Sequence, residues 1–231
     1  MLQNIEEGAI FIADSHYPNH GNEFLELLKK INNKELEVSQ LFLMGDNFDL
    51  LVGGLRRSYI PNAEAIEILK AISKNIQIFY FEGNHDFQLK KIFKNINIYT
   101  IGEHPQYMEF KKKRVGLSHG DRFAVGLGHN ILNHILRNSL FLAMISFFEE
   151  VIIANKTKQL KTKNICNSIE GFEQKTKDIS VNYKDVDLII EGHYHQAKII
   201  GNYISLPSLA CQKQVAIARN GEIVFVDIDN L

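Results

Sequence analysis

The chain has 231 residues, of which 45% are hydrophobic and 23% are charged, as is typical of a soluble globular protein. Its 26 basic and 27 acidic residues leave a net charge of −1. This balance gives the molecule no overall attraction for a polyanion, so we expect no nucleic-acid partner. The length suits a single domain that carries an insertion.

No segment of the sequence resembles a membrane or export signal. The first 16 residues, MLQNIEEGAIFIADSH, lack the basic start and long apolar core of a signal peptide. The longest apolar stretch, Leu140–Ala154, contains two glutamates and is too short to span a bilayer. We therefore expect a cytoplasmic location, with contact at the membrane surface left open. Cys166 and Cys211 are expected to be free thiols, with one disulfide as the alternative.

Short apolar runs that end in polar residues predict buried strands over Ala9–Ala13, Leu41–Met44, Ile76–Phe81, Arg114–Leu117 and Val186–Ile190. Apolar residues at helical spacing predict helices over Glu23–Ile31 and Ala63–Ser73. This alternation indicates an α/β fold with a largely buried sheet. Three later strands are predicted, the last two as a hairpin through Asn220-Gly221: Lys198–Ile204, Gln214–Arg219 and Ile223–Ile228.

Residues 122–182 interrupt the alternation and have a mostly helical pattern. Their apolar stretch, Leu140–Ala154, is followed by the lysine-rich run Asn155–Lys163. We interpret this region as a helical insertion, or lid, within a single domain that spans residues 1–231. The apolar stretch suits either core packing or an open binding face, and the sequence allows both.

Five polar clusters follow the predicted strands: Asp14-Ser15-His16, Gly45-Asp46-Asn47-Phe48-Asp49, Gly83-Asn84-His85-Asp86, Ser118-His119-Gly120-Asp121 and Gly192-His193-Tyr194-His195. Ligands bind at the carboxyl ends of strands in α/β sheets, so these clusters are expected to meet there. Imidazoles and carboxylates together suit Mn²⁺, Fe²⁺ or Zn²⁺ better than Ca²⁺. Strand alternation would point Asp14 and His16 the same way, and likewise His193 and His195. The glycines before Asp46, Asn84 and His193 would allow sharp turns.

The ordered clusters resemble the calcineurin-like metallophosphoesterase superfamily, whose pattern is DxH, GDxxD, GNH[DE], a histidine and GHxH. The resemblance implies an α/β/β/α sandwich and two divalent ions, for which Mn²⁺ is our first choice. It implies that Asp14, His16 and His195 bind the first ion, that Asp46 bridges both, and that Asn84, His119 and His193 complete the second. It further implies that His85 binds phosphate or protonates the leaving oxygen, and that Asp49 orients His85. From the residue alone, Asp49 can equally be a helix N-cap.

Within the superfamily, the chain is similar to the bacterial UDP-2,3-diacylglucosamine pyrophosphohydrolases, which carry a helical lid between HGD and GHxH. Leu136-Arg137-Asn138-Ser139-Leu140 resembles a segment of that lid. The resemblance implies a small-molecule phosphoester as substrate, here a nucleotide-linked lipid cleaved to lipid X and UMP, and a protein that can touch the inner membrane. Candidate substrate contacts are Asp121, Arg122, Arg137, Phe141, Met144 and Phe148, although Asp121 and Arg122 can also form a surface pair.

The chain departs from that group at two places. It has His85 where the best-known members have arginine, and no further histidine follows His195. Two other functions therefore stay open: a soluble phosphodiesterase or phosphatase acting on a nucleotide or phosphoprotein, and a non-catalytic scaffold on the same fold. Four histidines fall outside the motifs and are expected at the surface: His20, His104, His129 and His134.

Overall fold

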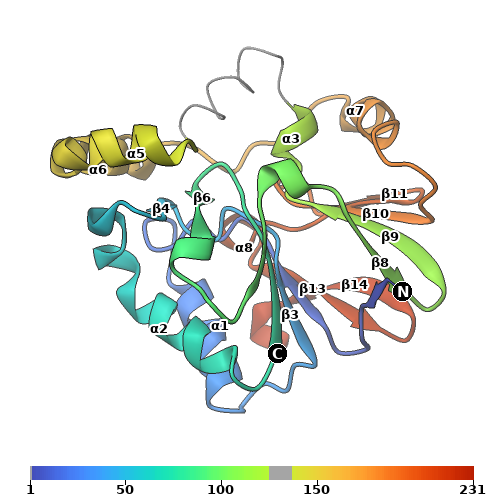
Figure 1. Cartoon of the computed structure of the whole chain (residues 1–231). Coiled ribbons are helices and arrows are strands. Elements are labelled where there is room, and N and C mark those ends of the chain that lie inside the picture. The colour runs from blue at the N-terminus through green and yellow to red at the C-terminus, as the bar shows by residue number, and fades with distance from the viewer. Residues whose placement is uncertain (1, 125–136) are drawn as a thin grey trace.

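The computed structural model describes residues 2–124 and 137–231, and its strands form two large sheets that face each other (Figure 1). The first sheet has the order β14-β13-β2-β3-β5-β7. Strands β2, β3, β5 and β7 are parallel, whereas β13 is antiparallel to both of its neighbours. The strands of this sheet are β2 (Ile10–Ile12), β3 (Gln40–Leu43), β5 (Gln77–Phe81), β7 (Asn97–Tyr99), β13 (Gln214–Arg219) and β14 (Glu222–Asp227).

The second sheet has the order β1-β8-β9-β10-β12-β11, and a small third sheet pairs β4 with β6. Within the second sheet, β9, β10 and β12 are parallel. The strands are β1 (Gln3–Asn4), β8 (Gln106–Phe110), β9 (Lys113–Ser118), β10 (Leu188–Glu191), β11 (Lys198–Ile200), β12 (Tyr203–Ser205), β4 (Leu51–Val52) and β6 (Asp86–Phe87).

Apolar side chains on the two faces of each strand separate the layers. In β3, Leu41 and Leu43 enter the core beneath α1 (Glu23–Asn32) and α2 (Ala63–Ile72). Phe42 points the opposite way, into the core between the two sheets, because side chains alternate along a strand. There its ring stacks between Phe11 at 4.5 Å and Phe79 at 4.7 Å, which the parallel register places on either side.

The outer face of the second sheet is covered by α7 (Phe172–Ser180), which packs Phe172 and Ile179 against Ile189 and Tyr203. The layers therefore run helix, sheet, sheet, helix, and the predicted α/β/β/α sandwich is confirmed. The first five strands predicted from the sequence correspond to β2, β3, β5, β9 and β10, and their predicted bounds lie within two residues of the observed ones. The single strand predicted over Lys198–Ile204 is wrong, because Gly201 with φ 58° turns the chain back and makes the antiparallel pair β11 and β12.

Between β9 and β10 the regular elements among the described residues are all helices: α3 (Asp121–Ala124), α5 (Ser139–Ile145), η5 (Ser146–Phe148), α6 (Glu149–Lys161) and α7. Helices α5 and α6 project away from the sheets at the left of Figure 1, above β4. Leu142 and Ile153 tie them to Val52, Leu55 and Phe87 in a small separate core. None of the described helices is long and apolar enough to cross a membrane. His129 and His134 lie outside the described residues.

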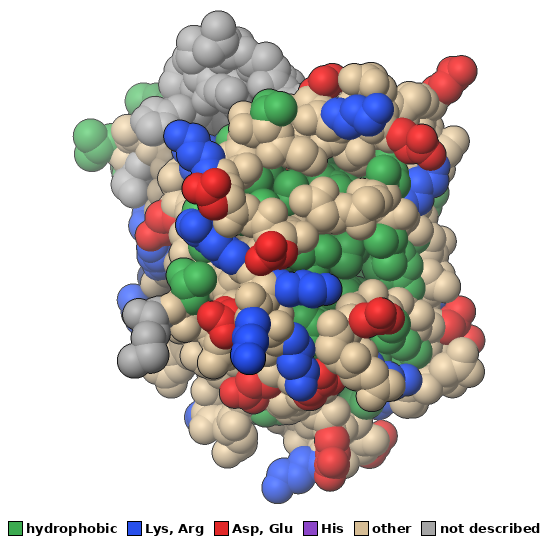
Figure 2. Space-filling model, turned by 90° about the vertical axis from the view of Figure 1, so that its right-hand side faces the viewer, with side chains coloured by type: hydrophobic (Ala, Val, Ile, Leu, Met, Phe, Trp, Pro, Cys, Tyr) green, Lys and Arg blue, Asp and Glu red, His purple; other side chains and the backbone are tan. Residues whose placement is uncertain are grey.

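Figure 2 shows the molecule from the right-hand side of Figure 1, over the edge of the sandwich. Lysines, arginines, aspartates and glutamates are interspersed there, and hydrophobic side chains show between them. No patch of a single charge forms on this face, and outside the grey atoms no histidine is visible on it. The predicted site therefore does not present its imidazoles on the part of this face that lies outside the grey atoms.

The free thiols expected at Cys166 and Cys211 are a wrong prediction, because the structure joins the two residues in a disulfide. The two cysteines are 45 positions apart, and nothing in the sequence indicates their pairing. Folding places the segment that follows α6 against α8 (Leu209–Gln212), and so brings the two sulfur atoms together.

His104 is another correction, since its side chain is buried and not exposed as expected. It lies against the ring of Phe81, and its Nε2 is 3.2 Å from the carbonyl oxygen of Tyr99. Burial lowers the pKa of His104 to about 3. The imidazole is therefore neutral in the folded protein at every pH at which the fold is tested below.

We expect His104 to make the protein sensitive to acid. The folded pKa lies below the ordinary value of 6.5, so the unfolded chain takes up a proton first. The contribution of the neutral His104 ring to the free energy of unfolding is fully present above about pH 6.5. It is lost as the pH falls toward 3, and the total loss is on the order of 4 kcal/mol. In urea unfolding of metal-free protein at pH 7 and pH 5, His104→Gln should lose less stability between the two pH values than wild type. An equal loss in both proteins would contradict this role.

Candidate metal centre

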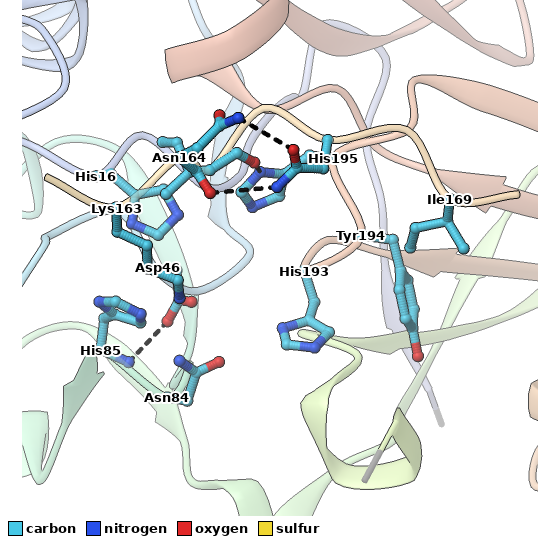
Figure 3. A pocket seen from close by; sticks show the side chains of 12 residues that line it. His16, Asp46, Asn84, His85, Lys163, Asn164, Ile169, His193, Tyr194 and His195 are labelled. Atoms are coloured by element: carbon cyan, nitrogen blue, oxygen red, sulfur yellow. Dashed lines mark hydrogen bonds between the residues drawn. The ribbon is translucent and has the colours of Figure 1, made fainter. Parts of the chain in front are cut away.

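The predicted site residues come from the carboxyl ends of five strands. Asp14 and His16 follow β2, Asp46 follows β3, and Asn84 and His85 follow β5. In the second sheet, His119 follows β9, and His193 and His195 follow β10. The two sheets point these ends to the same edge of the sandwich. There one pocket is lined by six of the eight side chains: His16, Asp46, Asn84, His85, His193 and His195 (Figure 3).

The loops that carry these side chains adopt an unusual backbone conformation. Asp14, His16, Asp46, His193 and His195 all have φ between 46° and 65°, the left-handed region that residues with a Cβ rarely occupy. The prediction that strand alternation aligns these pairs is therefore wrong, because β2 ends at Ile12 and β10 at Glu191. Left-handed turns, held by the surrounding fold, aim the side chains into the site instead.

Two glycines are required here for different reasons. Gly45 has φ 87°, and a Cβ on it would lie 2.4 Å from Nδ1 of His119. Gly83 has no positive φ, but a Cβ on it would lie 2.2 Å from Oδ1 of Asp46. Gly83 is thus needed because the loops approach each other closely, and not for the sharp turn that the sequence suggested.

Among the described residues, three groups of side chains offer metal-ligand atoms within 4.8 Å of one another: Asp14, His16 and His195; Asp46, His119 and His193; and His16, Asp49 and His85. The first group brings together Asp14, His16 and His195, which were expected at one ion, and the second brings together Asp46, His119 and His193, which were expected at the other. The third was not anticipated, because the sequence does not show that Asp49 turns toward His16.

Each of the two central carboxylates uses one oxygen to fix a neighbouring loop. Asp14 Oδ2 accepts a 2.8 Å hydrogen bond from the backbone of His193, and Asp46 Oδ1 accepts one of the same length from the backbone of His85. Their other oxygens face imidazoles: Asp14 Oδ1 is 3.1 Å from His195 Nε2, and Asp46 Oδ2 is 3.4 Å from His119 Nε2.

Backbone carbonyls set the orientation of two imidazoles. Nδ1 of His119 is 2.8 Å from the oxygen of Met44, and Nδ1 of His195 is 2.8 Å from the oxygen of Ile165. An Nδ1–H that donates to a carbonyl leaves Nε2 unprotonated and available as a ligand. Buried atoms without a hydrogen-bond partner in the described chain include Asp14 Oδ1, both ring nitrogens of His16 and His119 Nε2. Such unsatisfied atoms, aimed at one place, fit bound cations.

The electrostatics divide the imidazoles of the site. Burial alone would lower the pKa of His119 and of His195, but Asp46 and Asp14 beside them raise it, as the carboxylates hold a positive charge there. Burial lowers the pKa of His16, and it lowers the pKa of His193 to about 3, so both rings are neutral as a metal ligand must be. Burial alone would raise the pKa of Asp46, but His119 and His85 lower it well below its ordinary value. The Asp46 carboxylate is therefore ionised and available to a cation.

His85 and Asp49 are in contact, but not through the group that the motif suggested. Nδ1 of His85 is 2.7 Å from the backbone oxygen of Asp49, whereas the Asp49 carboxylate lies 3.4 Å from Nδ1 of His16. The same carboxylate is 3.8 Å from Nε2 of His20, which also lies 3.2 Å from the oxygen of Leu160. His20 was expected to be exposed, but it is half-buried between the site and the end of α6.

The pocket itself measures about 210 Å³ and includes residues that the motifs did not indicate. The segment after α6, which belongs to the predicted insertion, forms one wall with Lys163, Asn164, Ile165, Asn167 and Ile169 (Figure 3). Tyr194, between the two histidines of the last motif, also lines it. In the sequence, the place of Tyr194 between two predicted site histidines could have indicated that it lines the pocket. No motif indicated the wall formed by residues 163–169.

The charged candidates for substrate contact are engaged within the protein. Arg122 donates to the carbonyl oxygens of Gly102 and His104, and Asp121 is buried. Arg137 donates to the oxygen of Gly83 at 2.7 Å, and its guanidinium lies 3.4 Å from Glu82 and 3.7 Å from Asp121. Arg137 thus joins the residues just before α5 to the loop that carries Asn84.

The apolar candidates lie on the projecting helices. Met144 is 61% exposed and Phe148 is 68% exposed, while Phe141 is half-buried. Further apolar side chains are open on the same helices, namely Leu140, Phe147, Val151 and Ile152. The sequence allowed core packing or an open face, and the structure shows an open face.

The chain has recognisable relatives. The UDP-2,3-diacylglucosamine hydrolase of Psychromonas ingrahamii is 26% identical over 202 residues, which cover 81% of this chain and 80% of that protein. The enzyme of the same name from Histophilus somni is 25% identical over 201 residues, covering 83% and 86%. A dimetal phosphatase from Danio rerio superposes with a TM-score of 0.45 at 13% identity, covering 95% of this chain and 96% of that chain. The profile of the calcineurin-like phosphoesterases matches residues 9–197, and the chain belongs to this family of metal-dependent hydrolases.

Proposed function

We propose that the protein is a dinuclear-metal hydrolase that cleaves the pyrophosphate of UDP-2,3-diacylglucosamine to lipid X and UMP. In this proposal Asp46 contacts both ions, Asp14, His16 and His195 hold the first, and Asn84, His119 and His193 hold the second. The grouping of the carboxylates and imidazoles supports these roles, and Asn84 lines the same pocket. Mn²⁺ is the proposed metal, and the donor set also suits Fe²⁺ or Zn²⁺.

The observation that carries the lipid assignment is the open apolar face of α5, η5 and α6. Leu140 is 82% exposed and Phe147 is 86% exposed. The chain that continues from these helices, at residues 163–169, lines the proposed metal pocket. Exposed apolar surface of this kind marks a site for an apolar ligand or a membrane. Lys158 and Lys161 in the last turn of α6 would meet anionic head groups, so we propose peripheral contact with the cytoplasmic face of the membrane.

Two bound ions would supply a water with a lowered pKa and would offset charge on the phosphoryl oxygens. The chain itself contributes His85, which lines the pocket and is held through Nδ1 by the carbonyl of Asp49. With Nδ1–H donated to that carbonyl, Nε2 of the protonated ring is the atom that can give a proton to the leaving oxygen. The substrate would bind in this pocket, whose lining also includes Ile165 and Ile169.

Replacement of His85 tests this role. We expect His85→Ala to lower turnover of bis-p-nitrophenyl phosphate by about 10²–10⁴-fold, the usual contribution of a general acid. Metal content, measured by elemental analysis, should stay at the wild-type value because the seven proposed ligands remain. Loss of metal from the variant would show instead that His85 belongs to the ligand set.

The lid assignment predicts a substrate-specific effect. Phe148→Ser should raise KM for UDP-2,3-diacylglucosamine by about tenfold or more, since burial of a phenylalanine against an acyl chain contributes roughly 1.5–3 kcal/mol. Hydrolysis of bis-p-nitrophenyl phosphate should not change. Val181→Ser is the matched control, because Val181 is 78% exposed at the end of α7, away from the lid helices. Equal effects of the two variants would remove the basis for an acyl site.

The substrate is tested by comparing hydrolysis of UDP-2,3-diacylglucosamine, UDP-N-acetylglucosamine and bis-p-nitrophenyl phosphate in the presence of Mn²⁺. Strong preference for the acylated nucleotide, with release of UMP, is the expected result. Hydrolysis of the simple diester alone would keep the metal chemistry and replace the lipid by a soluble phosphoester. No hydrolysis of any of the three would favour a scaffold.

A further inference from the structure

We propose that the Cys166–Cys211 disulfide positions the metal ligand His195, and that its reversible reduction weakens metal binding at the site of Asp14, His16 and His195. The inference rests on the proposed role of His195 as a ligand. It concerns residues that none of the five motifs contains, and it gives the disulfide a purpose beyond stabilising the fold.

His195 is held at three points. Its Nδ1 lies 2.8 Å from the carbonyl oxygen of Ile165, the residue just before Cys166. Its own backbone oxygen accepts a 2.9 Å hydrogen bond from the side chain of Gln212, the residue just after Cys211. Its Nε2 then faces Asp14 Oδ1 at 3.1 Å. The two halves of the disulfide therefore flank the two groups that orient this imidazole.

The Cys211 side of the disulfide is firmly attached to the metal site. Ser208 begins α8, and its hydroxyl donates to the backbone oxygen of Asp14 at 2.8 Å. The backbone of Leu209 donates to the oxygen of Ala13. Helix α8 is thus fixed to the loop that bears Asp14 and His16, and Cys211 Sγ lies 3.8 Å from His195 Nδ1.

The Cys166 side lies in an irregular segment. Residues 163–169 form neither helix nor strand, and they make one wall of the pocket. Besides the contact of Ile165 with His195, Gln196 bonds to the backbone of Asn167 and Ile169 at 3.0 Å each, and the Ile169 side chain packs against the core of Phe172 and Ile179. The disulfide is the covalent link between this irregular segment and α8.

Reduction would remove that link while leaving every proposed ligand in place. The Ile165 carbonyl would then be positioned only by non-covalent contacts on its C-terminal side, those of Gln196 and the packing of Ile169, and the imidazole would lose part of the support that fixes its Nδ1 proton. Loss of a group that orients a ligating histidine typically costs about 10–100-fold in metal affinity. The expected effect therefore falls on metal binding, and saturating metal should overcome it.

The redox step can be made to run both ways. A phosphine such as tris(2-carboxyethyl)phosphine and one water convert the disulfide to two thiols and the phosphine oxide, so the phosphorus is oxidised and both sulfurs are reduced. Oxidised glutathione re-forms the bond by thiol–disulfide exchange, which releases two glutathione thiols. Low-molecular-weight thiols and disulfides are thus the class of partner that would act on this bond.

The experiment measures Mn²⁺ affinity by titration calorimetry on oxidised protein, on protein reduced and then freed of phosphine, and on Cys166→Ser/Cys211→Ser. We expect affinity at one of the two sites to fall by about 10–100-fold on reduction and to return after reoxidation. The double variant should have the Mn²⁺ affinity of the reduced protein, and neither the phosphine nor oxidised glutathione should change that affinity. Turnover of bis-p-nitrophenyl phosphate should recover at saturating Mn²⁺ in each case, which a general loss of structure would not allow.

A second variant keeps the test decisive if the reduced protein loses its fold by near-ultraviolet circular dichroism. Gln196→Ala with the disulfide intact removes the side-chain hydrogen bonds that hold residues 167–169, and we expect it to weaken Mn²⁺ binding at the same site. Unchanged affinity in Gln196→Ala, or equal affinity of folded oxidised and reduced protein, would overturn the inference while leaving the proposed function intact. Failure of the oxidised protein to bind Mn²⁺ at all would overturn both.

Discussion

Asp46→Ala is expected to abolish phosphodiester hydrolysis, with turnover of bis-p-nitrophenyl phosphate in Mn²⁺ falling by at least about 10³-fold. In the proposed site Asp46 is the carboxylate shared by both ions, and several kcal/mol of transition-state stabilisation depend on them. Its Oδ2 lies 3.4 Å from His119, and its Oδ1 accepts the backbone N–H of His85. The substitution therefore removes a ligand and also releases the loop that carries Asn84.

The measurement is the initial rate, together with metal content, for Asp46→Ala, His119→Ala and Asp178→Ala. Asp178 is an exposed carboxylate on α7, so its replacement should leave rate and metal content unchanged. His119→Ala should resemble Asp46→Ala, because His119 belongs to the same ligand group. Retained turnover in either site variant would end the two-metal interpretation.

Much of the fold could be predicted because its core strands are buried on both faces. A strand such as β3 reads as a continuous apolar run, and its neighbours β2 and β5 do the same. Strand β8 was missed because its buried residues, Met108 and Phe110, alternate with exposed or half-exposed ones and give no such run. Strand β7 has only three residues, too few for a periodic pattern.

The candidate site was predictable at the level of residue type and not of geometry. Each motif follows a strand directly, so the sequence places the ligands at one edge of the sheets. The left-handed backbone at Asp14 and His193 could not be foreseen, because nothing in these residue types requires it. Contacts between distant segments were also hidden, as with Ile165 on His195 and Asp49 beside His16.

Asp86 shows most clearly what the motif conceals, because the sequence assigns it no role beyond its place at the end of the third cluster, and yet it organises the loop around Asp46. Asp86 is fully buried. Its Oδ1 accepts hydrogen bonds from the backbone N–H groups of Asp46 and Gly83. Its Oδ2 accepts hydrogen bonds from the backbone N–H of Asn47 and from the hydroxyl of Tyr80. Asp86→Ala would leave these buried donors without an acceptor, so we expect the free energy of unfolding to fall by at least about 3 kcal/mol. Asp86→Asn keeps the shape and one acceptor oxygen and should lose less. Urea unfolding of the metal-free proteins measures both, and a wild-type midpoint for Asp86→Ala would show that the loop around Asp46 is held in place by other contacts.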